Sequence, residues 1–190
     1  MKTRLTCVVK TLTLAFFVLF LSASAISAKE YRYLKVNIHA QAKTAKVARA
    51  SYANYTNPGA GHIIIPVGTK VLIKDKSRKR IVFSYDDDKK EIIFEYHAPR
   101  MGMNVDQYLE KITSPNPVSL EGFSELDRKG IAEGKALAGM TREGVMAALG
   151  YPAAHRTPSL DAPTWIYWTN RFGTLAVDFD KNGKVQDVRN

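Results

Sequence analysis

The stretch "GMTREGVMAALGYPAAHRTPSLDAPTWIYW", residues 139–168, decides how the second half of the chain folds. It predicts a short helix, then a polar loop, then a strand with large aromatic side chains. Thr141 is a favourable N-cap and Glu143 suits the first helical turn, while Gly150 and Pro152 end the helix. A helix of about two and a half turns is not stable alone. We therefore expect it to pack on a sheet formed by the strands that follow.

Three strands are predicted after this helix, in "TWIYWTN", "GTLAVDF" and "KVQDVR". Asn182 and Gly183 join the last two, and this dipeptide is a strong signal for a tight hairpin. A weaker helix is predicted upstream, where Ser124 and Asp127 supply an N-terminal cap. The second half is thus expected to form two helices packed on a three-stranded antiparallel sheet.

The first half of the chain shows the period-two alternation of half-buried strands. It begins with "YRYLKVNIHA" and continues through "HIIIPVGTKVLIKD", "KRIVFSYD" and "KEIIFEYH". These segments predict an antiparallel meander or small barrel, followed by one helix that Asn104 and Gln107 cap. The predicted fold class of the whole chain is therefore α+β.

The domain organisation follows from the ends of these patterns. Residues 1–28 combine a basic start, the apolar run "LTLAFFVLFL" and the small residues "SASAISA", which is typical of a secretory signal peptide. Cleavage is expected after Ala25 or Ala28. The β-rich domain with its helix then covers residues 29–114, a proline-containing linker covers 115–120, and the second domain covers 121–190.

Charge and cysteine content limit the kinds of partner. The chain carries a formal charge of +10, and +7 remains once the three basic residues of the first 28 residues are removed. Such a balance favours anionic partners, and charge that serves solubility without a partner is the alternative interpretation. The one cysteine, Cys7, lies inside the predicted signal peptide and is badly placed for lipid attachment, so the mature chain has no thiol. An export signal argues against nucleic acid, and we predict no transmembrane segment in the mature chain.

The second domain resembles the SmpA/OmlA (BamE-like) domain family. The resemblance covers residues 120–190, and it is carried by Gly139, Met140, Thr141, Val145, Leu149, Gly150, Pro152, Trp165 and Tyr167. It implies helices on a three-stranded sheet and a role in outer-membrane assembly in the cell envelope. In the first domain, "IPVGTKVLI" resembles bacterial SH3-like modules.

The strand "TWIYW" separates two sets of aromatic side chains, because neighbouring residues of a strand point to opposite faces. Trp165 and Tyr167 are expected in the core, and Trp168 is a candidate for contact with a partner. The polar loop and the far end of the next strand add further partner-binding candidates, and a solvated connector is the alternative interpretation of the loop. These candidates are His155, Arg156, Asn170 and Arg171.

One predicted hairpin turn, "KDKSRKR", is strongly basic and is the candidate for contact with an anionic surface. A solvated turn without a partner is the alternative interpretation. The basic residues are Lys74, Lys76, Arg78, Lys79 and Arg80.

Motifs of catalysis and metal binding are missing from the sequence. The four histidines (His39, His62, His97 and His155) are scattered, and there is no nucleophile elbow or phosphate-binding loop. We therefore predict no enzyme activity, no cofactor and no metal. The predicted function is an exported protein-binding or assembly module of the cell envelope, with an unidentified envelope protein as partner. The alternative is a secreted module that binds anionic lipid or cell-wall polymer through its basic first domain.

Overall fold

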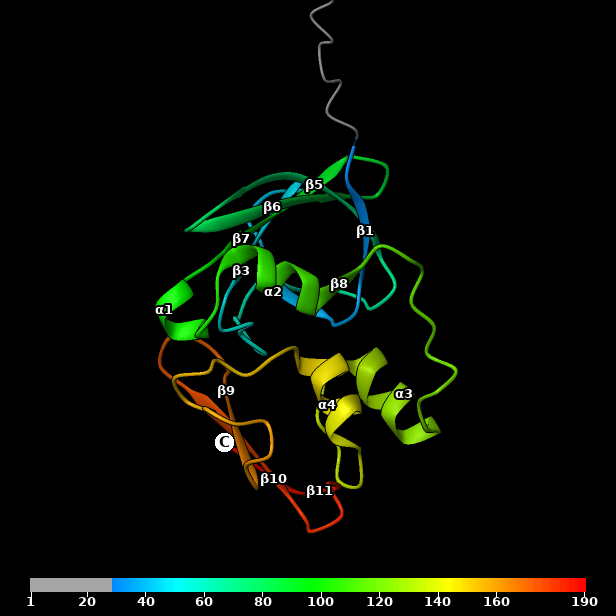
Figure 1. The fold of residues 1–190 in the computed structure, drawn as a ribbon, viewed down its shortest axis with the longest axis vertical. Helices are drawn as coiled ribbons and strands as arrows, with labels where there is room; N and C mark the ends of the chain where they lie inside the picture. The colour runs from blue at the N-terminus through cyan, green and yellow to red at the C-terminus, as the bar shows by residue number, and fades with distance from the viewer. Residues whose placement is uncertain (1–28) are drawn as a thin grey trace, which may run out of the picture.

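The computed structural model describes residues 29–190, so the predicted signal peptide lies outside the described residues. The described chain is mostly β, with an eight-stranded sheet, a three-stranded sheet and four short helices (Figure 1). The predicted α+β fold class is therefore wrong. None of the helices among residues 29–190 combines the length and the apolar character that crossing a membrane requires.

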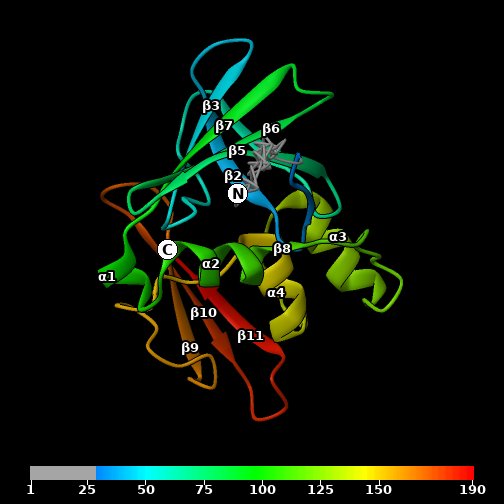
Figure 2. The ribbon, with the colours of Figure 1, turned by 45° about the horizontal axis from the view of Figure 1, so that its top comes forward.

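The larger sheet is built from the first half of the chain, in the order β4-β2-β3-β7-β6-β5-β1-β8. Its strands curl over one helix, α2 (Val105–Ile112), as Figure 2 shows from a second direction. Antiparallel pairing is interrupted only between β3 and β7, which run parallel. The strands are β1 (Tyr31–Leu34), β2 (Ile38–Ala42), β3 (Val47–Ser51), β4 (His62–Ile65), β5 (Lys70–Ser77), β6 (Arg80–Tyr85), β7 (Lys90–Glu95) and β8 (Thr113–Ser114).

Alternating apolar residues fill the concave side of this sheet. Ile81, Phe83, Ile92 and Phe94 of β6 and β7 are all buried. Tyr108 of α2 contacts this layer, with its ring 5.7 Å from that of Phe94. The helix begins at Asn104, which forms the predicted capping box with Gln107. A shorter helix, α1 (Ala98–Met101), precedes α2 and was not predicted.

One predicted strand is two strands in the structure. Leu34, Val36 and Ile38 are buried as expected, but the chain bends between β1 and β2. Asn37 lies in this bend, with 0% of its surface exposed. Its side chain is hydrogen-bonded to residues of the second half of the chain, so the bend between β1 and β2 coincides with a contact between segments distant in sequence.

The second half contains α3 (Glu125–Glu133), α4 (Arg142–Leu149) and a sheet of order β11-β10-β9. Its strands are β9 (Thr164–Trp168), β10 (Thr174–Phe179) and β11 (Val185–Arg189). Side chains of these elements share a second core, in which Trp165 is fully buried. However, α3 and α4 pack chiefly on each other and stand beside the sheet in Figure 1. The predicted SmpA/OmlA-like arrangement of helices on the three-stranded sheet is not seen.

The C-terminal end of α4 explains this difference, because the first half of the chain binds it. The last carbonyl groups of a helix have no partner within the helix. Here Ala147 accepts a hydrogen bond from the backbone of Asn37 at 2.8 Å, and Ala148 accepts from the His39 ring at 2.9 Å. The Asn54 side chain donates to Leu149. The sequence gives no local sign of these bonds, so the helix was expected to pack only on the strands that follow it.

We call this region the junction and define it by Asn37, His39, Asn54 and the carbonyl groups of Ala147, Ala148 and Leu149. Asn37 also donates to the carbonyl of Ile131 at 2.7 Å and accepts from the backbone of Val67 at 3.0 Å. The predicted division at residues 115–120 stays a prediction. Whatever its boundary, the two halves are joined here by buried hydrogen bonds.

Candidate functional site

The candidate site begins at Trp168, the last residue of β9. Trp165 and Tyr167 are 0% and 1% exposed, so their face of the strand is the core face, as expected. Trp168 points the other way and is half-buried. Its indole nitrogen is buried without a hydrogen-bond partner in the described part of the chain. An aromatic ring in this position combines an apolar surface with an unused donor.

Two predicted partner-binding residues lie against this ring. The His155 ring stacks on Trp168, with a centroid distance of 6.5 Å and an angle of 21° between the planes. The guanidinium group of Arg156 lies 5.7 Å from the ring centroid of Trp168. Both side chains are exposed. The loop between α4 and β9 therefore brings a stacked imidazole ring and a guanidinium group to Trp168, and the guanidinium group has the geometry of a cation–π contact.

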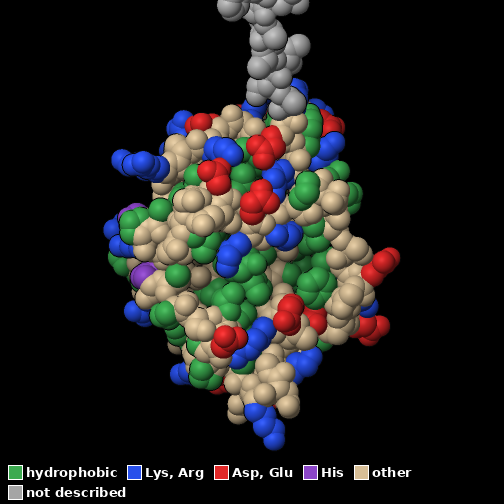
Figure 3. All heavy atoms as spheres, viewed as in Figure 1, with side chains coloured by type: hydrophobic (Ala, Val, Ile, Leu, Met, Phe, Trp, Pro, Cys, Tyr) green, Lys and Arg blue, Asp and Glu red, His purple; other side chains and the backbone are tan. Residues whose placement is uncertain are grey.

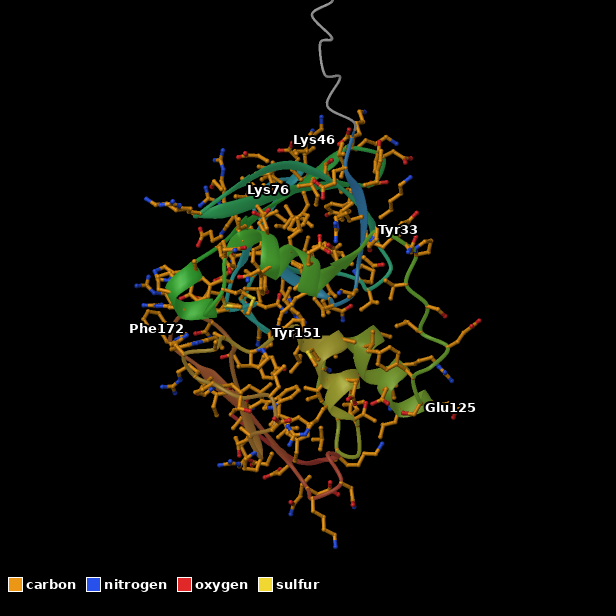
Figure 4. All side chains as sticks on the ribbon, in the orientation of Figure 1. Tyr33, Lys46, Lys76, Glu125, Tyr151 and Phe172 are labelled. Atoms are coloured by element: carbon orange, nitrogen blue, oxygen red, sulfur yellow. The ribbon has the colours of Figure 1, made fainter. Side chains whose placement is uncertain are left out.

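The turn between β9 and β10 holds the other predicted candidates, Asn170 and Arg171. Asn170 has a structural role, since its side-chain oxygen accepts from the backbones of Phe172 and Gly173 at 2.9 and 3.0 Å. This turn directs Phe172 outward, where 84% of its surface is exposed. The guanidinium group of Arg171 lies 4.7 Å from the Phe172 ring centroid. Figure 4 shows Phe172 at the outer edge of the molecule, on the side of α1.

Phe172 was missed by the sequence analysis, although a signal was present. The segment "TNRFGT" places the aromatic residue between a turn-forming Asn and a Gly. A side chain at the tip of such a tight turn has no neighbouring strand to cover it. Among the described residues it is by far the most exposed large apolar side chain.

Residues of the first half continue the same region. The carbonyl of Arg100 in α1 accepts from the backbone of His155 at 3.2 Å. The Arg100 side chain donates to the hydroxyl of Tyr52, and the Tyr52 and His97 rings lie 5.7 Å apart. We call the whole set the aromatic–basic surface, and Figure 3 shows basic and histidine side chains along this edge. Its residues are Tyr52, His97, Arg100, His155, Arg156, Trp168, Arg171 and Phe172.

The basic hairpin predicted to meet an anionic surface is mostly neutralised by the protein itself. Lys76 lies 2.7 Å from Asp106, and Arg80 lies 2.9 Å from Asp75. Lys74 is paired with Asp88 and Glu91, at 3.6 and 3.2 Å. Within residues 29–190, Arg78 and Lys79 make no ion pair. The hairpin therefore offers two unpaired bases instead of five.

The four histidines, scattered in the sequence, separate into two pairs of different character. His97 and His155 are exposed on the aromatic–basic surface. His39 is 1% exposed and stacks on His62, with the Nδ1 of His39 3.1 Å from the Nε2 of His62. Burial lowers the pKa of His39 to about 4 and also lowers the pKa of His62.

The Nε2 of His39 must carry a proton because it donates to the carbonyl of Ala148. Its Nδ1 therefore accepts from His62 in the neutral pair. In the part of the chain that the structure describes, no group of three potential metal-ligating side chains is found.

Comparison with known proteins adds no relative. No protein-family model matches the chain, and neither the curated proteins nor the solved structures contain a significant match. The resemblances to the SmpA/OmlA family and to SH3-like modules therefore stay predictions from sequence motifs.

Proposed function

We propose that the chain is an exported, non-catalytic binding module of the bacterial cell envelope, and that an acidic partner protein docks on its aromatic–basic surface. The observation that carries the proposal is the exposure of Phe172 beside Arg171, on the side of the molecule where His155 and Arg156 frame Trp168. Aromatic and arginine side chains dominate the energetics of many protein interfaces. Because the Phe172 side chain is 84% exposed, a partner can contact its ring without a rearrangement of the fold.

The chemistry of the surface indicates the charge of the partner. Arg100, Arg156 and Arg171 are all exposed, and none of the three forms an ion pair within residues 29–190. Complementary charge increases the rate of association and selects against basic partners. We therefore expect an acidic protein segment with at least one apolar side chain that contacts Phe172.

The alternative function, binding of anionic lipid or cell-wall polymer through the first half, is the weaker proposal. It was based on five bases of one hairpin, and the ion pairs of Lys74, Lys76 and Arg80 reduce the charge available there. A surface of paired charges attracts a polyanion less than a surface of the same bases unpaired.

Affinity capture from envelope extracts tests the proposal. The test variant combines Arg156→Gln, Arg171→Gln and Phe172→Ala, and the matched control combines Arg78→Gln, Lys79→Gln and Leu126→Ala. Each triple variant loses two positive charges and one exposed apolar side chain. The wild type and the control should retain the same acidic protein, and the test variant should lose it.

Two results would contradict the proposal. Equal capture by both triple variants would show that the aromatic–basic surface is not the docking site. Salt-sensitive retention on anionic liposomes that only the hairpin variant loses would favour the alternative function.

A further inference from the structure

A cavity of about 500 Å³ lies beside the aromatic–basic surface, on the outer face of β2 and β3. Ala48 and Ala50 of β3 point into the first core, so Arg49 and Ser51 point to the opposite face of the sheet. The turn between β9 and β10 contributes Arg171, so the cavity is bordered by both halves of the chain. The polar residues that line it and carry the inference are Lys43, Arg49, Ser51, Tyr55, Glu95 and Arg171.

Positive charge reaches this cavity from three separate segments. Lys43 comes from the turn after β2, Arg49 from β3 and Arg171 from the β9–β10 turn. Arg49 lies 4.0 Å from Glu95, which is the outer limit of an ion pair. Within residues 29–190, Arg171 makes no ion pair. With one carboxylate against three bases, the polar lining carries an excess of positive charge.

Two neutral hydroxyl groups, of Ser51 and Tyr55, complete the lining. The Ser51 hydroxyl accepts from the backbone of Ala53 at 3.3 Å and is also hydrogen-bonded to the Tyr55 phenol, so the pair has one hydroxyl proton left to donate into the cavity. Burial raises the pKa of Tyr55, so its phenol keeps its proton at neutral pH. His39 also borders the cavity, but both of its ring nitrogens are engaged, by Ala148 and by His62.

We propose that this cavity binds a phosphate group, either as a free phosphate or as the phosphate of an ester. A tetrahedral anion accepts hydrogen bonds in several directions, which suits donors that come from three sides. The volume falls within the usual range for small-ligand sites, about 300–1,000 Å³, so there is room for an organic substituent. This proposal does not depend on the docking of a protein on the aromatic–basic surface.

A substitution of Glu95 should change phosphate binding in the direction opposite to a substitution of Arg49 or Arg171. Its carboxylate borders the cavity and repels an anion, while it holds Arg49 near. Removing the charge of Glu95 should therefore strengthen phosphate binding, whereas removing the charge of Arg49 or Arg171 should weaken it. A cavity that is merely basic would bind other anions as well as it binds phosphate, so selectivity for phosphate over succinate separates the two cases.

Titration calorimetry of the purified chain with inorganic phosphate and with glycerol 3-phosphate tests the site. We expect Arg49→Gln and Arg171→Gln each to weaken binding by about three- to tenfold, as for a lost charged hydrogen bond in a partly exposed site. Glu95→Gln should tighten binding by about two- to fivefold by the same reasoning. Arg78→Gln, which removes an exposed arginine outside the cavity, is the matched control and should leave the dissociation constant unchanged.

Further measurements distinguish a lipid phosphate from a soluble phosphate ester, and some of their results would overturn the proposal. Flotation with phosphatidic acid vesicles that is lost in Arg171→Gln but kept in Arg78→Gln would assign a lipid phosphate; tighter binding of glycerol 3-phosphate than of vesicles would assign a soluble ester. No saturable binding of any of the three phosphates would overturn the proposal. Equal binding of succinate would do the same, because the cavity would then not select phosphate. Equal weakening by Arg78→Gln would also overturn it, because the effect would then not be specific to the residues of the cavity.

Discussion

The two halves of the chain meet in two regions that use similar residues in opposite ways. In the junction, Asn37, His39 and Asn54 are buried and donate to the carbonyl groups that end α4. On the aromatic–basic surface, His155 and Arg156 are exposed beside a half-buried tryptophan. Polar groups with internal partners contribute to stability, whereas polar groups that face solvent are available to a partner. Substitutions in the junction should therefore change stability, and substitutions on the surface should change binding.

The largest effect is expected for Asn37→Ala. This change removes one hydrogen bond from each of the carbonyls of Ile131 and Ala148, which keep their bonds from Gly134 and His39. It leaves the backbone N–H of Val67 without its partner. Each of the two lost hydrogen bonds costs about 1 kcal/mol and the unsatisfied N–H about 1–3 kcal/mol, so we expect a loss of about 3–5 kcal/mol in the free energy of unfolding. Urea denaturation measures this loss. Asn116→Ala, at an exposed position, is the control and should change stability by less than about 0.5 kcal/mol.

The next effect concerns pH and follows from His39. Its pKa is lowered from 6.5 to about 4 in the folded chain, chiefly by burial, so folding favours the neutral ring. The unfolded chain binds more protons between these values. Stability is therefore fully present above pH 6.5 and is lost as the pH falls toward 4, by about 3 kcal/mol in total. His62 acts in the same direction, since its pKa is lowered as well.

Denaturation at a series of pH values tests this dependence on pH. His39→Gln should flatten the slope between pH 6.5 and 4. His155→Gln, at an exposed position on the aromatic–basic surface, is the control variant. If the two variants behave alike, the junction does not contain the histidine that titrates.

A smaller effect is expected at the other end of α4, where the cap is local. The Thr141 hydroxyl accepts from the backbone of Gly144 at 2.9 Å, as the sequence predicted. Thr141→Ala should lower stability by about 1 kcal/mol, the usual value for an N-cap. Thermal unfolding of Thr141→Ala and of Asn37→Ala measures the difference in stability between the two variants. A larger loss for Thr141→Ala would mean that the junction contributes less to α4 than its own first turn does.

The smallest effect on stability is expected for Phe172→Ala. The side chain is 84% exposed, so its removal should change the free energy of unfolding by less than about 0.5 kcal/mol. Capture of the envelope partner should nevertheless fall by at least about tenfold, since central aromatic residues of interfaces commonly contribute 2 kcal/mol or more. A loss of stability without a loss of capture would place Phe172 in the packing of the molecule instead.

Local features of the fold were predictable, and contacts between distant segments were not. The capping box at Asn104, the caps of α4 and the hairpin at Gly183 depend on residues close in sequence, and all are present. The parallel pairing of β3 with β7 and the bend at Asn37 depend on partners far along the chain. Period-two alternation is the same for parallel and antiparallel strands, so it gave no sign of the mixed sheet.

The candidate site shows the same limit. The grouping of Trp168, His155 and Arg156 was anticipated as a set of candidates, because a loop and the strand after it are neighbours in the chain. The contribution of Tyr52, His97 and Arg100 was not anticipated, since it requires the two halves to be placed relative to each other. The functional role of all these residues stays a prediction.

The most direct test of the docking proposal is site-specific cross-linking in the cell envelope. A photoreactive phenylalanine analogue replaces Phe172 in one variant and Asn116, an exposed residue remote from the aromatic–basic surface, in another. The account predicts that the probe at position 172 gives one dominant adduct with an acidic envelope protein, and that the probe at position 116 does not. The same adducts from both positions, or none from position 172, would contradict it.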